Sequence, residues 1–261
     1  MIDAWSTTGG GDELAGQNPS DPAHVARSVL ANIRGAERAG VPARLCALCT
    51  ELLPVTGASI SLMAPASAQR LLCSSDDVAR QLAEAQYTLG DGPGTHAFST
   101  GAPVFAADLS AGDDARRWPL FALRALETGA KAVFSFPLGI GAIAAGTLDL
   151  YRDSPGSLTE AETGTALLIA DAATLGVLRL YAGPGETEYA EGDGDMDWLR
   201  GESDHDGVHQ ATGMVMIQCD VGAEEALLRL RARAFASGVT LSALAREVVE
   251  RRVSLGESDR A

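Results

Sequence analysis

Positive charge is scarce in this sequence, and lysine is almost missing. The 261 residues include 20 lysines and arginines against 35 aspartates and glutamates, a formal net charge of −15, and Lys131 is the single lysine. Proteins that bind nucleic acid without specificity are normally basic, so this balance argues against that class. Any contact with a polyanion must therefore come from a local group of arginines.

Motifs that would announce an enzyme or a metal site are also missing. No Ser–His–Asp arrangement, phosphate-binding glycine loop or paired-carboxylate site stands out, so we expect no catalytic residue and no cofactor. Cys46 and Cys49 form a C-x-x-C pair, but no second pair completes a zinc site, and their place on an apolar helix face predicts buried packing. His205 and His209 are four residues apart, but Gly207 between them disfavours a shared helix, so no metal is expected.

The chain also lacks the marks of export or membrane insertion. The first 22 residues, MIDAWSTTGGGDELAGQNPSDP, have neither a basic start nor an apolar run, and no apolar stretch is expected to reach transmembrane length. We therefore expect a cytoplasmic protein without a membrane span. Residues 1–21 read as a disordered tail.

Three short amphipathic helices can be read at the C-terminal end. They are expected at Val208–Gln218, at Ala223–Ala236 and after Thr240, which is a good N-cap residue. Gly238 ends the second helix, because glycine adopts a left-handed conformation at little cost. Such a small module has no room for a substrate pocket, so it is expected to bind a partner through its surface.

This stretch resembles the ANTAR module of bacterial transcription antiterminators, which binds paired hairpins in nascent RNA. The residues that carry the resemblance are Ala211, Gly213, Met216, Glu225–Ala226, Leu230, Ala234 and the run Leu244–Val249. Family members often carry a lysine where this chain has Thr212. The resemblance implies RNA as the partner, with contacts from Gln210, Thr212, Arg229, Arg233 and Arg246.

The arginines carry the physical case for RNA. Arg229 and Arg233 lie one turn apart on one flank of the second helix, and Arg231 lies on the other. Guanidinium groups pair with phosphates and stack on unpaired bases. The alternative is an ordinary solvated face with ion pairs such as Glu247 with Arg251.

The segment before this module is strongly acidic and rich in glycine. Between Gly183 and Val208 there are nine acidic residues and one arginine, which predicts a flexible linker at 183–207. The acids simply keep the linker soluble, or they lie over the arginines and mimic RNA phosphate in the resting state. Screening acts over about 8 Å in physiological salt, so mimicry requires close contact.

The large N-terminal part, residues 22–182, alternates helices and strands in an order that resembles a GAF domain. The supporting residues are the loop Leu89–Gly94, Asp108–Leu109, Arg117–Pro119, Phe136–Leu138 and Gly146–Arg152. The expected fold class is therefore α+β, with an antiparallel sheet flanked by helices and a three-helix ANTAR bundle at 208–255, followed by a tail at 256–261. The order of the two domains is similar to that of actinobacterial GAF–ANTAR regulators.

The GAF resemblance also implies a sensor and a dimer. Its ligand would lie between the sheet and the elements that cover it, and the residues expected there are Leu89, Phe98, Phe105, Trp118, Phe121 and Phe136. Each is an ordinary core residue on the alternative view. The signal is an unknown small molecule or protein, and the first and last helices (Ala23–Arg38 and Glu160–Tyr181) would form a homodimer.

The leading interpretation is a cytoplasmic regulator that senses a signal and binds paired RNA hairpins to control transcription termination. One alternative is a signalling adaptor whose C-terminal bundle binds protein instead of RNA. A methionine sulfoxide reductase is disfavoured, because Gly94 stands where related loops often place a cysteine.

Overall fold

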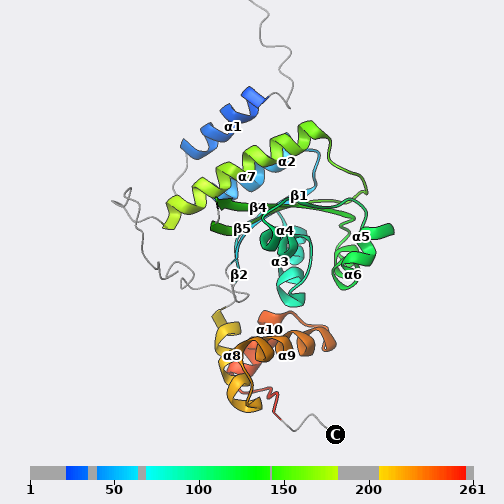
Figure 1. Cartoon of the computed structure of the whole chain (residues 1–261), viewed down its shortest axis with the longest axis vertical. Helices are drawn as coiled ribbons and strands as arrows, with labels where there is room; N and C mark the ends of the chain where they lie inside the picture. Colours follow the sequence, from blue (N-terminus) through cyan, green and yellow to red (C-terminus); the bar gives the residue numbers. More distant parts are fainter. Residues whose placement is uncertain (1–21, 35–39, 64–68, 142, 182–205, 257–261) are drawn as a thin grey trace, which may run out of the picture.

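The structure is a computed structural model that describes residues 22–34, 40–63, 69–141, 143–181 and 206–256. These residues form a sheet domain (residues 22–181) and a C-terminal module (residues 206–256), which Figure 1 shows below the sheet. The predicted tail 1–21, nearly all of the predicted linker 183–207 and most of the tail 256–261 lie outside the described residues.

Five antiparallel strands form one sheet in the order β2-β1-β5-β4-β3. The strands are β1 (Gly57–Met63), β2 (Gln69–Ser74), β3 (Val104–Ala106), β4 (Ala132–Ile140) and β5 (Ile143–Arg152). Because β5 lies between β1 and β4, Ile60 and Phe136 both lie opposite Leu148. The predicted antiparallel sheet flanked by helices is confirmed.

One face of the sheet holds the main apolar core. It is covered by α1 (Pro22–Arg34), α2 (Val41–Leu52) and α7 (Glu160–Tyr181), which Figure 1 shows above the strands. Alternate residues in the central part of the sheet, such as Ile60, Phe134 and Leu148, are fully buried against this layer. The period of two therefore places large side chains on this face.

The opposite face combines an apolar rim with a polar centre. It is covered by α3 (Asp77–Leu89), α4 (Pro93–Thr100), α5 (Gly112–Arg117) and α6 (Pro119–Glu127). Trp118 and Phe121 form a second core there with Val133. In the middle of this face the strands contribute buried polar residues, which are Ser59, Ser61, Ser135, Thr147 and Asp149.

Two helices on this face were missed by the sequence pattern. The predicted loop Leu89–Gly94 leads directly into α4, and α5 precedes α6 where only one helix was expected. Both are short and rich in small or polar residues, so they show no helical periodicity. Proline at the first position begins α4, since its missing N–H costs nothing there.

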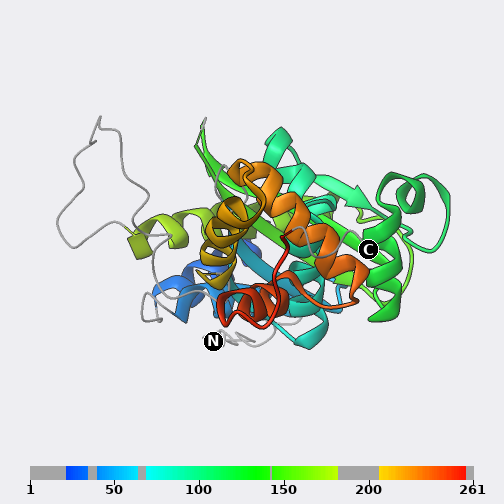
Figure 2. The ribbon, with the colours of Figure 1, turned by 90° about the horizontal axis from the view of Figure 1, so that it is seen from below.

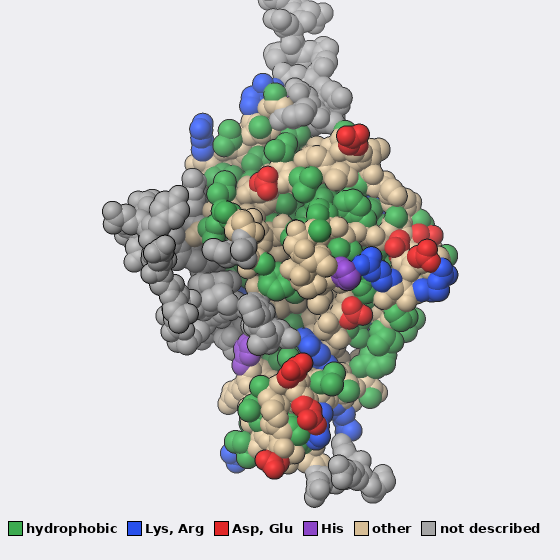
Figure 3. Space-filling view, viewed as in Figure 1, with side chains coloured by type: hydrophobic (Ala, Val, Ile, Leu, Met, Phe, Trp, Pro, Cys, Tyr) green, Lys and Arg blue, Asp and Glu red, His purple; other side chains and the backbone are tan. Residues whose placement is uncertain are grey.

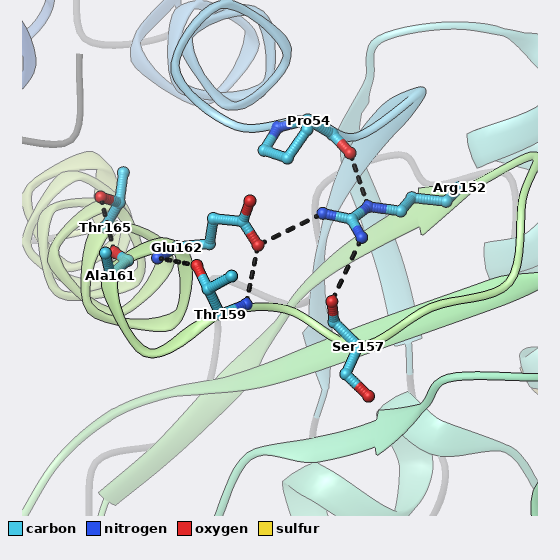
Figure 4. Close-up of polar contacts among 7 residues, drawn as sticks. All are labelled: Pro54, Arg152, Ser157, Thr159, Ala161, Glu162 and Thr165. Carbon is cyan, nitrogen blue, oxygen red and sulfur yellow. Dashed lines mark hydrogen bonds and ion pairs between the residues drawn. The ribbon is translucent and has the colours of Figure 1, made fainter. Parts of the chain in front are cut away.

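A capping box forms the start of α7. Thr159 N donates to Glu162 Oε2 at 2.7 Å, and Glu162 N donates to Thr159 Oγ1 at 3.2 Å. Figure 4 shows that the same carboxylate also pairs with Arg152 of β5. The distance from Arg152 Nη2 to Glu162 Oε2 is 3.4 Å. The cap therefore ties the helix to the sheet.

The expectation that no apolar stretch reaches transmembrane length was wrong. Within α7, Glu160–Leu178 is long and apolar enough to cross a membrane, and half of it is buried inside the protein. Ile169, Ala173 and Val177 belong to the main core beneath the helix. A core helix with alanines on one side and leucines on the other passes the same test of length and composition.

The three helices expected in the C-terminal module are present as α8 (Asp206–Cys219), α9 (Ala223–Ala236) and α10 (Leu241–Val249). Thr240 caps α10 by accepting from Ala243 N at 3.1 Å, and Gly238 adopts the expected left-handed conformation at φ 68°. α8 begins at Asp206, two residues earlier than predicted. The module core is small and rich in alanine. Its buried residues include Ala211, Val215, Ala226, Leu230, Ala234, Leu241, Leu244, Ala245 and Val248.

Candidate nucleic-acid interface

Three of the predicted RNA-contact arginines lie on the surface of the module. Arg229, Arg233 and Arg246 are all exposed. Arg229 pairs with Glu225 one turn earlier, at 2.6 Å, and this hydrogen bond raises the pKa of its guanidinium. Figure 3 shows acidic and basic side chains mixed on this part of the surface. The exposed face therefore presents guanidinium groups that a partner can reach, and these groups lie among acidic side chains.

The predicted contacts on α8 differ from each other in availability. Gln210 is exposed and directed to no described partner. Thr212 is half-buried, and its hydroxyl donates to Val208 O at 2.7 Å, one turn earlier in the same helix. The Thr212 hydroxyl therefore donates its hydrogen bond within α8, whereas its oxygen can still accept a hydrogen bond from a partner.

The module rests on the end of α3 in the sheet domain. Leu241 N, at the start of α10, donates to Thr88 Oγ1 at 3.0 Å, and Ser242 Oγ donates to Glu84 Oε1 at 3.0 Å. Tyr87 is 2 % exposed and belongs to the apolar core of the module. Figure 1 and the view from below in Figure 2 both place α9 and α10 against the sheet domain. The three residues of α3 form what we call the dock.

Arg231, on the other flank of α9, lies in this contact. Its guanidinium packs on Gly90 so closely that a Cβ at position 90 would lie 2.6 Å from Nη1. Gly90 has a left-handed φ of 67°, which ends α3. Because glycine has no Cβ, the Arg231 guanidinium can lie against it. Burial lowers the pKa of Arg231, and Tyr87 partly offsets that effect. Nε of Arg231 is fully buried and has no hydrogen-bond partner among the described residues.

A cleft of about 260 Å³ lies beside the dock, between α3, α6 and the turn that joins α9 to α10. Its apolar side includes Leu89 and Phe235, and Arg124 lies over the ring of Phe235 with 6.0 Å between Cζ and the ring centre. Arg124 also pairs with Glu127 at 3.1 Å. The cleft is thus lined by both domains and has room for a small amphipathic molecule.

The polar centre of the sheet is linked to the dock through α3. Gln86 donates to Asp149 Oδ2 at 3.0 Å and accepts from Gly94 N at 2.6 Å. Burial raises the pKa of Asp149 to about 6, although hydrogen bonds, including those from Gln86 and Thr147, favour its charged form. The space at this point is only about 10 Å³, close to the size of one water molecule.

The six residues expected around a sensor ligand are not gathered in one cavity. Phe105 packs against Phe136 with the rings tilted by 53° and 5.5 Å between ring centres, on the face covered by α7. Trp118 and Phe121 lie in the core on the opposite face. Leu89 lines the cleft between the domains, and Phe98 is half-buried in α4. Contact between these residues and a ligand stays a prediction.

Charged side chains approach Trp118. Arg117 Cζ lies 4.5 Å from the centre of the Trp118 ring, and Arg117 Nη2 lies 2.8 Å from His96 Nε2. Arg116 instead pairs with Asp113 at the surface. The indole itself is 2 % exposed, so this arrangement covers the core and leaves little of the ring for a ligand.

The predicted buried packing of the two cysteines of the C-x-x-C motif is confirmed, and both are free thiols. Cys46 and Cys49 are at most 1 % exposed, and the pKa of each thiol is raised, for Cys46 mainly by a hydrogen bond with Cys73 and for Cys49 by burial. Raised thiol pKa values oppose the thiolate that nucleophilic chemistry needs. Within the described ranges no group of three His, Cys, Asp or Glu residues is placed to hold a metal ion. His205 lies outside those ranges, and His209 is exposed.

Sequence patterns missed the dock and the polar centre. Glu84, Tyr87 and Thr88 belong to the last turns of α3. Asp149 had a readable signal, because a carboxylate at an inward position of a central strand is unusual. The dock had none, since it depends on how two distant segments meet.

The arrangement defines a class of protein: an α+β domain with a five-stranded antiparallel sheet that carries a small helical module on one of its helices. Residues 203–249 match the family model of the ANTAR domain, and these residues include all of α8, α9 and α10. The C-terminal module is therefore an ANTAR domain. No curated protein matches the chain.

Solved structures similar to the chain include GAF domains. One is the GAF domain of the phosphoenolpyruvate-protein phosphotransferase from Acinetobacter, with 12 % identity over 64 % of this chain and 97 % of that one, and a TM-score of 0.49. The corresponding domain from Coxiella burnetii has 15 % identity over 63 % and 98 % of the two chains and a TM-score of 0.48.

Proposed function

We propose that this protein is a signal-responsive regulator that binds paired hairpins in nascent RNA and controls transcription termination. The observation that carries the proposal is the ANTAR match at 203–249, on a folded three-helix module that exposes Arg229, Arg233 and Arg246. The GAF-type domain is the natural place for the signal. A cytoplasmic location and the absence of catalysis belong to the same proposal, as does membership of the actinobacterial GAF–ANTAR group.

RNA contact in this proposal is electrostatic and local. The three exposed arginines would contact phosphates and loop bases, with Gln210 and Thr212 adding polar contacts from α8. Three phosphate contacts on single-stranded loops give a log–log dependence of affinity on salt with a slope of about −2 per module.

A homodimer brings two modules to two hairpins. α7 exposes a row of leucines, Leu167, Leu168, Leu175 and Leu178, and α1 exposes Leu30. Figure 1 shows that α1 and α7 lie on the opposite side of the sheet from α3, which carries the dock. Two copies that pair through this row would bury apolar surface that is now in contact with water.

Gel-shift titration tests the proposal with a pool of double-hairpin RNAs whose loops are randomised. We expect a retained complex that weakens with salt, and we expect the double variant Arg229→Ala/Arg233→Ala to weaken binding and flatten the slope. Arg44→Ala/Arg80→Ala, in the sheet domain, is the matched control for the loss of two positive charges. A pool that yields no enriched RNA at low salt contradicts the proposal.

A second function, binding of a protein partner by the module, is favoured by one observation. Ile217 on α8 is 86 % exposed and Leu228 on α9 is 64 % exposed, and RNA phosphates give neither side chain a partner. If Ile217→Ser/Leu228→Ser abolishes capture of a protein but leaves RNA affinity unchanged, the module has a protein partner.

A further inference from the structure

α3 presents to the module the two kinds of group that RNA also presents. The Glu84 carboxylate accepts a hydrogen bond from Ser242 and places negative charge at the start of α10, where the helix dipole favours an anion. The ring of Tyr87 packs into the module and acts electrostatically on Arg231. A carboxylate and an aromatic ring thus lie where a phosphate and a base would suit the same surface.

The contact with α3 leaves the charge of Arg231 without a described counter-ion. It forms no ion pair with a described carboxylate, its Nε has no described hydrogen-bond partner, and burial lowers its pKa. Burying a cation without a compensating anion destabilises the docked arrangement. An arginine that only joined the two domains would gain from an acidic partner, and α3 directs its nearby acid, Glu84, to Ser242 instead. The described residues therefore supply no anionic partner for this guanidinium, which leaves it suited to an anion such as a phosphate.

We infer that the face of the module covered by α3, formed by Arg231 and the first turn of α10, is a second RNA-contact surface, and that the dock competes with RNA for it. The inference rests on the proposed function, because it supposes that the module binds RNA. It adds a surface on the opposite flank of α9 from Arg229 and Arg233. RNA reaches both flanks only after the module leaves α3.

The competition gives the sheet domain a way to control binding. Gln86 is bonded to Asp149 and to the start of α4, and it directly precedes Tyr87 and Thr88 of the dock. A change at the polar centre that moves the end of α3 therefore alters the hydrogen bonds from α10 to Thr88 and Glu84. Release adds one phosphate contact per module, which steepens the salt slope by about 0.7.

The test alters only the sheet domain of the full-length protein. Thr88→Val removes the acceptor for Leu241 N without changing side-chain shape, and Glu84→Gln removes the negative charge. We expect the double variant Glu84→Gln/Thr88→Val to bind the double-hairpin RNA pool about tenfold more tightly, a typical size for coupling between sites. The control is Gln81→Ala on the same helix, where the side chain bonds Asp77 and not the module.

Arg231→Ala then separates RNA contact from mere release. In the Glu84→Gln/Thr88→Val background it should remove the added affinity and the steeper slope, whereas in the otherwise wild-type protein it should change the slope little. This double-mutant cycle isolates the coupling between the dock and Arg231. Hydrogen exchange of α10 amides, Leu241 above all, reports release independently of RNA.

A locked form covers the case in which two substitutions fail to open the dock. Glu84→Cys/Ser242→Cys, bridged by a short bismaleimide, should bind the RNA pool about tenfold more weakly than the single-cysteine proteins given the same reagent. Unchanged affinity in the locked form, or release of α10 with unchanged affinity and slope, overturns the inference while the proposed function stands. If released and locked forms all fail to enrich RNA, the proposed function fails as well.

Discussion

The sheet domain and the ANTAR module are held together by different amounts of apolar surface. The main core of the sheet domain includes large side chains such as Phe134, Phe136 and Leu148. The module core depends on alanines, and its one aromatic member, Tyr87, belongs to the sheet domain. Since small domains bury little apolar surface, the module has the smaller reserve of stability and takes part of it from its neighbour. Control of docking is therefore also control of the module's stability.

The largest test of this difference is a core truncation in each region. Leu230→Ala should cost about 2–5 kcal/mol, which approaches the whole stability of a domain of this size. Calorimetry should show the module transition lost and the sheet-domain transition kept. Leu148→Ala, with the same change in the larger core, should lower the melting temperature of the sheet domain without abolishing its transition. Equal loss of both transitions in the Leu230→Ala protein would show that the two regions fold as one unit.

The polar centre sets a second contrast, because the described module core contains no buried carboxylate. The native pKa of Asp149 is about 6, above its usual value near 3.9, so the native state binds a proton more readily than the unfolded state. This group therefore destabilises the fold at pH above about 6, by about 3 kcal/mol, and the penalty disappears as pH falls toward 4. Asp149→Asn should stabilise the sheet domain at pH 8 and have little effect near pH 4.

Denaturant titrations at both pH values measure this effect, and the module transition serves as the internal reference. Asp153→Asn, on the exposed side of the same chain segment, is the control for loss of one negative charge. A stability gain for Asp149→Asn that is the same at pH 4 and pH 8 would contradict the raised pKa.

The same cap substitution in both regions gives a smaller effect. Thr159→Ala at α7 and Thr240→Ala at α10 each remove one side-chain cap, at a cost of about 1 kcal/mol. Because the module has less stability in reserve and fewer residues, the shift in melting temperature should be larger for Thr240→Ala. Serine at either position retains the acceptor and should restore most of the loss. A larger shift for Thr159→Ala would reverse the ranking of the two regions.

The smallest effect on stability is expected at the exposed arginines. Arg229 and Glu225 form a surface pair, and such pairs contribute little to folding. Arg229→Ala should leave both melting transitions unchanged while it weakens RNA binding, and Arg229→Lys should restore part of the affinity. A marked loss of module stability would assign this residue to the fold rather than to a partner.

Local patterns carried most of the fold. Thr240 with Gly238 predicted the turn before α10, and Thr159 with Glu162 marks the start of α7 in the same local way, because caps and left-handed glycines act over a few residues. The missed helices α4 and α5 are held by the layer that they cover, since their own sequences lack an apolar stripe. Among the six positions predicted for a ligand pocket, Phe105 and Phe136 could not be assigned to a face of the sheet without the strand pairing of β3 with β4.

The sequence by itself determined the two domains, the alternation of the strands, the three helices of the module and the exposure of Arg229, Arg233 and Arg246. The division into two domains rests on the family resemblances, whereas the strands, helices and exposed faces follow from periodicity and capping, which are read within one or two turns. Only the tertiary structure decided that Arg231 is buried against Gly90 and that Glu84, Tyr87 and Thr88 hold α10. The pairing of these residues joins positions more than 140 apart in the chain, so its free energy depends on how the two domains pack.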